Sequence, residues 1–418
     1  MDTKIKNLIN KEIRRQEETL DLIASENIAS DSILGILGSP LVNKYSEGYS
    51  GKRYYPGNAV IDELENLAKS EALKAFGLKE KDWGVNAQPY SGSPANQAVY
   101  FALLNPGDVV MGLSLSSGGH LTHGHKVNFS GKAYKSIQYG LKPNGEMDYL
   151  DLEKKAKEFK PKLIISGATA YSKEIDFKKI GEIAKKIGAY HLADISHIAG
   201  FVAIGEHQAP FPYADVVTST MHKSLRGPRG AVIFSKKENV KSESGDSKVA
   251  TIAELIDRAV FPGLQGGPHN NVTAAIAECF IEVQKQEFKK YALQALKNAG
   301  VLALELKKLG FKLVSDGTDN HLILLDLKEK KISGLEAEKR LEENGILANR
   351  NSVPGDDKPF NPSGIRLGTL SLTSRGMMDG EMKLLADLIN KVVINNENVA
   401  EEVKKLCLKF SINYKPLE

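Results

Sequence analysis

The sequence predicts an α/β protein: a mainly parallel, doubly wound sheet followed by a smaller α+β region at the C-terminal end. Short apolar strands alternate with helical segments between about residues 84 and 234, the pattern of a parallel sheet. Shorter strands and helices mix after about residue 310. A chain of 418 residues is long for one core. We therefore expect an N-terminal helix or arm (1–30), a large domain (31–280) and a small domain (281–418).

Composition and charge narrow the function classes. Hydrophobic residues make up 41% and charged residues 26% of the chain, as in ordinary globular proteins. The 56 basic and 52 acidic residues are interspersed and give a net charge of +4, which predicts no nucleic-acid face. No apolar run predicts a membrane span or a signal segment. Cys279 and Cys407 are far apart in helix-like sequence, so we expect a reducing, cytoplasmic setting without disulfides.

The first elements of the chain are predicted from helical spacing and capping residues. Apolar residues at helical spacing in 1–20 predict an amphipathic helix that packs on the small domain or on a partner subunit. Ser30 or Asp31 is expected to cap a short apolar helix. A strong helix pattern follows over 61–76, and a strand is expected near 84–87.

A loop over residues 44–57 concentrates aromatic and hydroxyl groups around one carboxylate, Glu47. One interpretation is a compact surface loop with glycine turns. Loops with this composition are more often binding surfaces, which we favour here. The aromatic residues of the loop are Tyr45, Tyr49, Tyr54 and Tyr55.

The segment 89–96 is expected to start a helix with free backbone N–H groups. Ser93 is a natural N-cap, and Pro94 suits the first turn. With Ser91 and Gly92, this helix start could hold a phosphate, although an ordinary capped helix is also possible. The spacing of a nucleotide-triphosphate loop is absent.

Three histidines, His120, His123 and His125, follow the strand at 108–113 in a glycine-rich segment. No carboxylates lie nearby in the sequence, so we predict no metal site. An imidazole stacked on a planar cofactor ring is the better functional interpretation for His120.

The most informative residues lie at the ends of two strands. A strand over 189–193 ends at Asp194, with His197 three residues later, and the strand 214–218 leads into a turn that carries Lys223. Parallel strands place their carboxyl ends at one crevice, so both side chains should meet there. Pyridoxal phosphate needs such a lysine amine and such an acid. Taken separately, Asp194 could be a helix N-cap and Lys223 a surface charge. Taken as a pair at neighbouring strand ends, they favour a site for this cofactor.

The C-terminal half begins with a polar stretch, 236–249, that predicts a mobile insertion loop. A glycine-rich turn at 261–268 precedes a long helix from about Asn271, and Gly310 is expected to end a helix over 302–309. The remaining pattern predicts strands at 311–314, 322–325 and 346–348 and helices at 335–343, 381–393 and 399–410.

Arg366 lies between apolar neighbours, which predicts a half-buried guanidinium. Burying an arginine is costly unless it is paired, and its planar fork matches a carboxylate. The partner could be an internal Asp or Glu, or the carboxylate of an amino-acid substrate.

Together these segments resemble the serine hydroxymethyltransferase family, nearly end to end, from 22–27 through Arg366. The motifs include Gly118-Gly-His-Leu-Thr-His-Gly124 and Thr220-Met-His-Lys223. The resemblance implies pyridoxal-phosphate fold type I and reversible transfer of the hydroxymethyl carbon of L-serine to tetrahydrofolate, giving glycine and methylenetetrahydrofolate. Retro-aldol cleavage and direct attack by a folate nitrogen both stay open. The family also implies a homodimer, or a tetramer, with shared sites.

The resemblance also implies roles for single residues. Lys223 would form the Schiff base, Asp194 would hold the ring nitrogen, and His120 would stack on the ring. The other cofactor-binding residues would be His197 near the phenolic oxygen, Ser91, Gly92 and Ser93 at the phosphate, Thr169, Thr220, and Gly267 from the other subunit. The substrate side would consist of Arg366 at the carboxylate, Ser25 and His222 beside it, Glu47 as acid–base group, Tyr45 and Tyr55 from the neighbouring chain, and Leu115, Leu121 and Asn351 around the folate.

Three positions depart from the family pattern: Pro56, Thr169 and Leu370. They put substrate affinity in question rather than the reaction type. The nearest rival function is a folate-independent pyridoxal-phosphate aldolase of the threonine aldolase type, or an aminotransferase. A binding protein with a degenerate site, which contacts RNA, is a rival from another class. A nicotinamide dehydrogenase is a weaker alternative, because the sequence lacks the glycine fingerprint that such enzymes have after their first strand.

Overall fold

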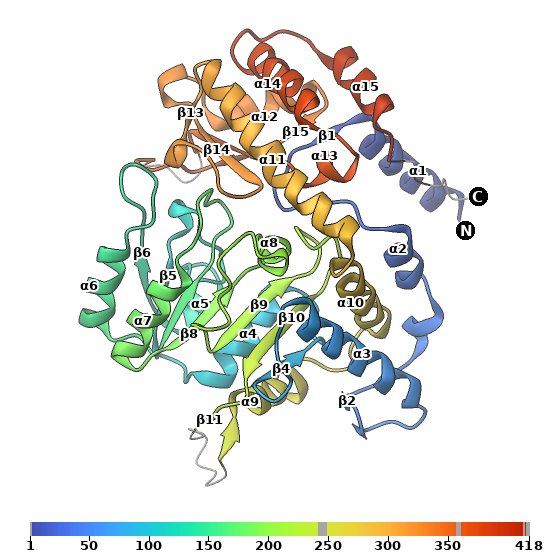
Figure 1. Cartoon of the computed structure of the whole chain (residues 1–418), viewed down its shortest axis with the longest axis vertical. Helices are drawn as coiled ribbons and strands as arrows, with labels where there is room; N and C mark the ends of the chain where they lie inside the picture. Colours follow the sequence, from blue (N-terminus) through green and yellow to red (C-terminus); the bar gives the residue numbers. More distant parts are fainter. Residues whose placement is uncertain (1, 241–248, 357–360, 413, 415–418) are drawn as a thin grey trace.

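A seven-stranded sheet forms the centre of the protein in a computed structural model, which describes residues 2–240, 249–356, 361–412 and 414 (Figure 1). The α/β class predicted from the sequence is confirmed. Strand β10 runs antiparallel to both of its neighbours, and the other neighbouring strands are parallel. The spatial order is β4 (Trp83–Asn86), β10 (Ala231–Lys236), β9 (Val216–Thr220), β8 (Tyr190–Asp194), β7 (Leu163–Ser166), β5 (Val109–Leu113) and β6 (Lys135–Tyr139).

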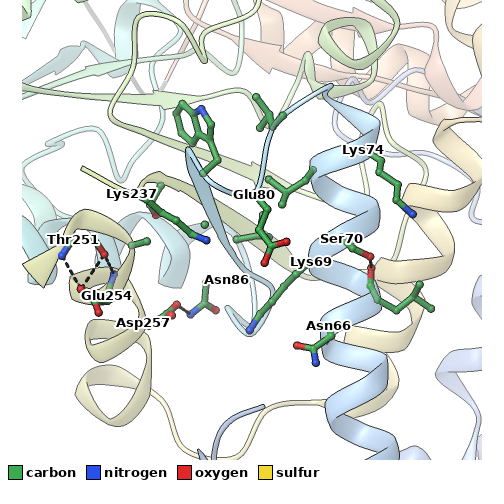
Figure 2. Close-up of a pocket in the computed structure, with 18 of the residues that line it drawn as sticks. Asn66, Lys69, Ser70, Lys74, Glu80, Asn86, Lys237, Thr251, Glu254 and Asp257 are labelled. Carbon is green, nitrogen blue, oxygen red and sulfur yellow. Dashed lines mark hydrogen bonds between the residues drawn. The ribbon is translucent and has the colours of Figure 1, made fainter. Parts of the chain in front are cut away.

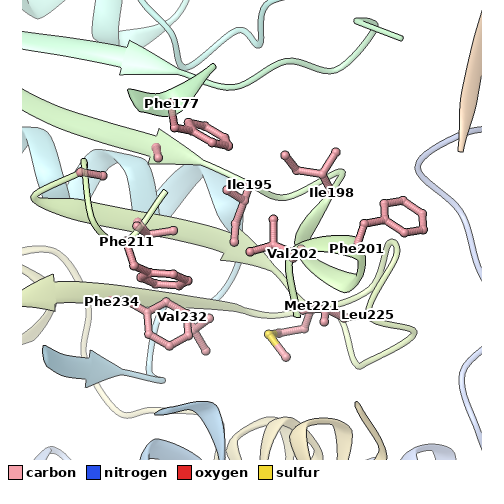
Figure 3. Close-up of a cluster of buried hydrophobic side chains, with 14 of the residues drawn as sticks. Phe177, Ile195, Ile198, Phe201, Val202, Phe211, Met221, Leu225, Val232 and Phe234 are labelled. Carbon is pink, nitrogen blue, oxygen red and sulfur yellow. The ribbon is translucent and has the colours of Figure 1, made fainter. Parts of the chain in front are cut away.

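Both faces of this sheet are covered by helices, as its strands of almost continuous apolar residues require. In β7, Ile164 packs on one face while Leu163 and Ile165 pack on the other. Helices α4 (Gly92–Leu103) and α9 (Ile252–Arg258) cover the face of Leu163. The opposite face, part of which Figure 3 shows, is covered by α3 (Ala59–Ala75), α6 (Tyr149–Phe159), α7 (Phe177–Ile187), α8 (Ala199–Ile204) and α10 (Asn270–Val283).

A second hydrophobic core lies in the C-terminal part of the chain, above the large sheet in Figure 1. The long helix α11 (Gln286–Lys308) joins the two cores, since Phe288 packs in the first and Leu302 in the second. The antiparallel sheet of this part has the order β13 (Lys312–Leu313), β14 (Leu322–Asp326), β17 (Gly364–Gly368) and β16 (Asn349–Asn351). Its helices are α12 (Gly334–Glu343), α13 (Leu370–Ser374), α14 (Asp379–Val393) and α15 (Ala400–Lys409).

The N-terminal segment belongs structurally to this second core. Strand β1 (Leu20–Asp21) pairs in parallel with β15 (Ile346–Leu347), and Leu20 and Leu22 are fully buried there. Contacts between residues so far apart in the chain cannot be deduced from local patterns. The predicted domain boundaries at residues 30 and 280 stay predictions.

Most predicted elements are present, with shifts at their ends. Helix α1 (Thr3–Glu18) and helix α2 (Asp31–Leu37) form as expected, and the Ser30 hydroxyl caps α2 by accepting from the Ile33 N–H. The expectation that Ser93 is the N-cap of α4 is wrong, because the helix begins at Gly92 and Ser91 is its N-cap residue. The sequence analysis did not anticipate β6 or α6.

Of the stretch predicted as a mobile loop, residues 241–248 lie outside the described residues. On either side of them, β11 (Asn239–Val240) pairs with β12 (Ala250–Thr251). The 44–57 loop contains a second short pair, β2 (Gly48–Tyr49) and β3 (Lys52–Arg53). In the part of the chain that the structure describes, no helix is both long and apolar enough to cross a membrane.

Candidate active site

A cavity of about 510 Å³ lies where β8 and β9 end, and we call it the central cavity. It brings together side chains from segments more than 300 residues apart in the sequence. The residues expected at the site that line it are Ser25, Ser91, Gly92, Ser93, His120, Thr169, Asp194, His197, Thr220, His222, Lys223 and Arg366. The position of these residues around one cavity agrees with the geometry expected from the sequence; their individual roles stay predictions.

Lys223 follows β9 in a tight turn and is only 9% exposed. Burial disfavours the charged amine and lowers its pKa from 10.5 to about 8, although the carboxylate of Asp194 works in the opposite direction. A lysine with such a pKa is partly neutral near physiological pH. Its amine can therefore act as a nucleophile toward a carbonyl group.

Asp194 ends β8, and its register partner in β9 is Thr218. Its Oδ2 atom accepts hydrogen bonds from His123 Nε2 (3.1 Å) and Asn96 Nδ2 (2.9 Å). Burial alone would raise the pKa of Asp194, but the bond and charge of His123 outweigh it and hold the pKa below its ordinary value. The carboxylate is therefore ionised and can hold a protonated ring nitrogen.

The helix-cap alternative for Asp194 holds in part, because its Oδ1 accepts from the Ser196 N–H (3.1 Å). One oxygen thus orders the following turn while the other belongs to the buried network. The sequence analysis missed His123 and Asn96 as partners of this carboxylate. His123 lies in the glycine-rich histidine segment, but no local spacing connects it to a residue 71 positions later.

The start of α4 forms a compact cradle with Thr220. A Cβ atom on Gly92 would lie 2.6 Å from the Thr220 Cγ2 atom, so only glycine fits here without displacement. The Thr220 Oγ1 atom is buried and has no hydrogen-bond partner within the described residues. Free N–H groups at a helix start beside an unpartnered hydroxyl suit an anionic group such as a phosphate.

Three histidines around the central cavity, His120, His197 and His222, have pKa values below the ordinary value of histidine. Burial lowers the pKa of His120 to about 4 and that of His222 to about 3. His197 lies stacked on His321, with the ring centres 5.6 Å apart. The Nδ1 atoms of His197 and His222 have no partner in the described chain. Among the residues that the structure describes, no group of His, Cys, Asp or Glu side chains could hold a metal ion.

Arg366 lies on β17 and is 8% exposed. Its Nε donates to Asn349 Oδ1 (3.0 Å) and its Nη1 donates to the Thr169 carbonyl (2.7 Å). Among the residues described, no carboxylate forms an ion pair with it, so the internal acid partner considered from the sequence is not found. Burial lowers its pKa to about 10. A buried, unpaired guanidinium at a cavity is well suited to bind a carboxylate from solution.

The 44–57 loop forms a separate cluster in the same chain. Tyr45 donates its hydroxyl hydrogen to Glu47 Oε1 (3.4 Å), and its ring contacts that of Tyr55 with centres 5.1 Å apart. A Cβ on Gly267 would lie 3.3 Å from the Tyr45 ring. Tyr45 and Tyr55 are 55% and 44% exposed. None of these residues lines the central cavity of its own chain, so their place in a neighbouring chain's site stays a prediction.

The residues expected around the folate also lie outside the lining of the central cavity. Leu115 and Leu121 are exposed, and Asn351 lies on β16. The surface position of the two leucines leaves them free to contact a ligand. Their folate role stays a prediction.

A larger, open cavity of about 1110 Å³ lies between α3 and α9 along the edge strand β4 (Figure 2). Figure 2 shows Lys69 and Glu80 pointing into it, with Asn86 and Asp257 at one side. It contains none of the residues predicted for the site. The convergence of unpartnered buried polar atoms and shifted pKa values favours the smaller, central cavity as the active site.

The fold and the central cavity define the class of the protein: an α/β enzyme of pyridoxal-phosphate fold type I, with a lysine and a carboxylate at adjacent strand ends. The family model of serine hydroxymethyltransferase matches residues 1–389. A serine hydroxymethyltransferase of Desulfotalea psychrophila is 50% identical over 416 residues, which cover 98% of this chain and 94% of that protein. The chain therefore belongs to the serine hydroxymethyltransferase family.

Proposed function

We propose that the protein catalyses the reversible transfer of the hydroxymethyl carbon of L-serine to tetrahydrofolate, which gives glycine and methylenetetrahydrofolate. Membership of the family supports this reaction. The observation that carries the proposal is the convergence of Lys223, Asp194 and Arg366 on one cavity. An amine, an anion and a carboxylate-binding fork are the three groups that amino-acid chemistry on pyridoxal phosphate requires.

The residues present fit pyridoxal phosphate as the cofactor. The buried amine of Lys223 would bind its aldehyde, Asp194 would hold its ring nitrogen, and His120 would lie against its ring. The start of α4 and Thr220 would hold its phosphate, which would give the orphaned hydroxyl a partner. When bound, the cofactor supplies an electron-accepting ring that stabilises negative charge on the substrate α-carbon.

The substrate would be oriented by its carboxylate. Arg366 is fixed by its bonds to Asn349 and Thr169, so its remaining donors can bind serine without first being ordered. The fixed guanidinium would hold the substrate in one orientation relative to Lys223. Ser25 and His222 line the same cavity and would also contact the substrate.

Proton transfer at the serine hydroxyl is assigned to Glu47. Because Glu47 does not line the central cavity of its own chain, this role requires a second copy of the chain. We therefore propose a homodimer in which Glu47, Tyr45 and Tyr55 complete the neighbouring site. Gly267 packs against Tyr45 and would reach that site with it.

Tetrahydrofolate is proposed as the carbon acceptor, with Leu115, Leu121 and Asn351 around it. The alternative, a folate-independent aldolase, is not favoured by the family match. Serine cleavage should be measured with and without tetrahydrofolate in the protein loaded with pyridoxal phosphate. Formation of glycine and methylenetetrahydrofolate in equal amounts supports the proposal, whereas cleavage at the same rate without tetrahydrofolate would indicate the aldolase.

A further inference from the structure

Asn27 ends the segment 22–27, and the proposed chemistry gives it no role. Its side-chain amide is nevertheless fully engaged. The Nδ2 atom donates to the Lys223 carbonyl (2.8 Å) and to the Tyr291 hydroxyl (2.7 Å). The Oδ1 atom accepts from the Ser374 hydroxyl (2.7 Å) and from the Ile28 N–H (2.9 Å). An amide has two donor hydrogens and two acceptor lone pairs, so every bonding position of Asn27 is in use.

The turn that follows Lys223 depends on these contacts. Arg226 adopts a left-handed conformation (φ 62°) and donates its N–H to the Lys223 carbonyl (3.0 Å). This conformation is unfavourable for a residue with a side chain and is kept only where neighbours hold it. The Arg226 guanidinium lies 4.8 Å from the ring centre of Tyr291, and its Nε donates to the Ile28 carbonyl (3.3 Å). The N-terminal segment therefore supports the backbone of the lysine turn.

The other end of the same segment contacts the strand of Arg366. The N–H of Gly368, the last residue of β17, donates to the Leu22 carbonyl (2.7 Å). A Cβ on Gly368 would collide with Ala24, so the two backbones are in direct contact. Ser374, the hydroxyl partner of Asn27, is the last residue of α13, which begins two residues after β17 ends. Segment 22–27 thus bridges the lysine turn and the arginine strand.

We propose that Asn27 is a positioning residue that fixes the main chain of Lys223 relative to the strand of Arg366. A serine whose carboxylate is bound at Arg366 would then be held at a fixed distance from the amine of Lys223. This inference rests on the proposed function. A misplacement of about 1 Å can cost about 100-fold in rate. Loss of Asn27 should therefore lower kcat and leave substrate binding at Arg366 largely intact.

The test compares Asn27→Ala with a matched control, Asn298→Ala. Like Asn27, Asn298 has a side-chain amide that donates two bonds, to Thr373 Oγ1 and the Met377 carbonyl (2.9 Å each), but Asn298 is fully buried and is not bonded to Lys223. We expect kcat to fall about 10- to 100-fold in Asn27→Ala, with the serine KM changed less than about threefold. The control should lose thermal stability but keep kcat within about twofold of the parent.

Two further readouts separate positioning from stability. In the cofactor-free protein, competitive acetylation measures the pH midpoint of Lys223, which should move upward in Asn27→Ala as water reaches the loosened turn. Ser374→Ala removes the link to α13 but keeps the bond from Asn27 to the Lys223 carbonyl, so it should give a smaller loss of kcat than Asn27→Ala. If Asn27→Ala matches the Asn298→Ala control in kcat and in the Lys223 midpoint, the positioning role is wrong. Failure of the parent to use tetrahydrofolate would instead overturn the proposed function.

Discussion

Replacement of Arg366 by leucine should strongly weaken substrate binding without unfolding the protein. In the free protein, burial lowers the pKa of this arginine from 12.5 to about 10, which corresponds to about 3 kcal/mol against the charged form. Its bonds to Asn349 and Thr169 offset this cost by about 1.5 to 3 kcal/mol each. The two effects are of similar size. The free energy of unfolding of cofactor-free Arg366→Leu should therefore lie within about 3 kcal/mol of the parent value.

Binding should respond very differently. Truncating one partner of a buried, hydrogen-bonded charge pair costs about 2 to 5 kcal/mol, or about 30- to 4,000-fold in affinity. Arg366→Lys keeps the charge but loses the planar fork, so its affinity for serine should lie between that of the parent and that of Arg366→Leu. The dissociation constants of serine and glycine can be measured from the change in visible absorbance of the protein loaded with pyridoxal phosphate.

A suitable control is Arg350→Ala. Arg350 lies on the adjacent strand β16, is exposed and pairs with Glu338. Its removal should leave serine affinity unchanged, because surface ion pairs contribute little. Parent-like serine binding in Arg366→Leu would refute the carboxylate role. Equal losses of affinity and stability would show that Arg366 is structural.

Three other predictions concern the cofactor side of the cavity. Because the pKa of Lys223 is lowered to about 8, its buried charge destabilises the cofactor-free fold below pH 8, and this cost disappears as the pH rises toward 10.5. Lys223→Met should therefore be more stable than the parent by up to about 3 kcal/mol at pH 7. In urea unfolding, this difference in the free energy of unfolding should become smaller by pH 10. A gap independent of pH would contradict this. His123→Phe removes the bond that keeps Asp194 ionised and should weaken pyridoxal phosphate about tenfold in absorbance titrations, whereas unchanged affinity would remove His123 from the site. Gly92→Ala places a Cβ 2.6 Å from Thr220 and should weaken pyridoxal phosphate more than pyridoxal, which lacks the phosphate; equal losses for both would place the phosphate elsewhere.

The sequence was sufficient to predict how Lys223 and Asp194 meet. Consecutive parallel strands end at one edge of a sheet, so two polar residues after such strands share a crevice whatever the details of packing. The burial of Arg366 was also predictable, from its apolar neighbours. Its lack of an acidic partner was not, because that depends on every segment that packs around it.

Partners distant in the chain could not be predicted. The bond between His123 and Asp194 depends on how the loop after β5 folds over the end of β8, and no spacing in the sequence encodes it. The same holds for Asn27, whose bonds reach Lys223, Tyr291 and Ser374. The N-cap of α4 was wrongly predicted at Ser93 because Ser91, Gly92 and Ser93 are all compatible with a helix start. The close contact of Gly92 with Thr220 is tertiary and could not be deduced from the local sequence.

The central claim is that Lys223 is the amine that binds the cofactor in the cavity shared with Asp194 and Arg366. Borohydride reduction of the protein loaded with pyridoxal phosphate, followed by peptide mass spectrometry, tests this directly. The mass of one pyridoxyl phosphate group should appear on the peptide that contains Lys223, and serine added before reduction should diminish it. A group attached to a different lysine, or no attachment in a protein that still converts serine with tetrahydrofolate, would contradict the account.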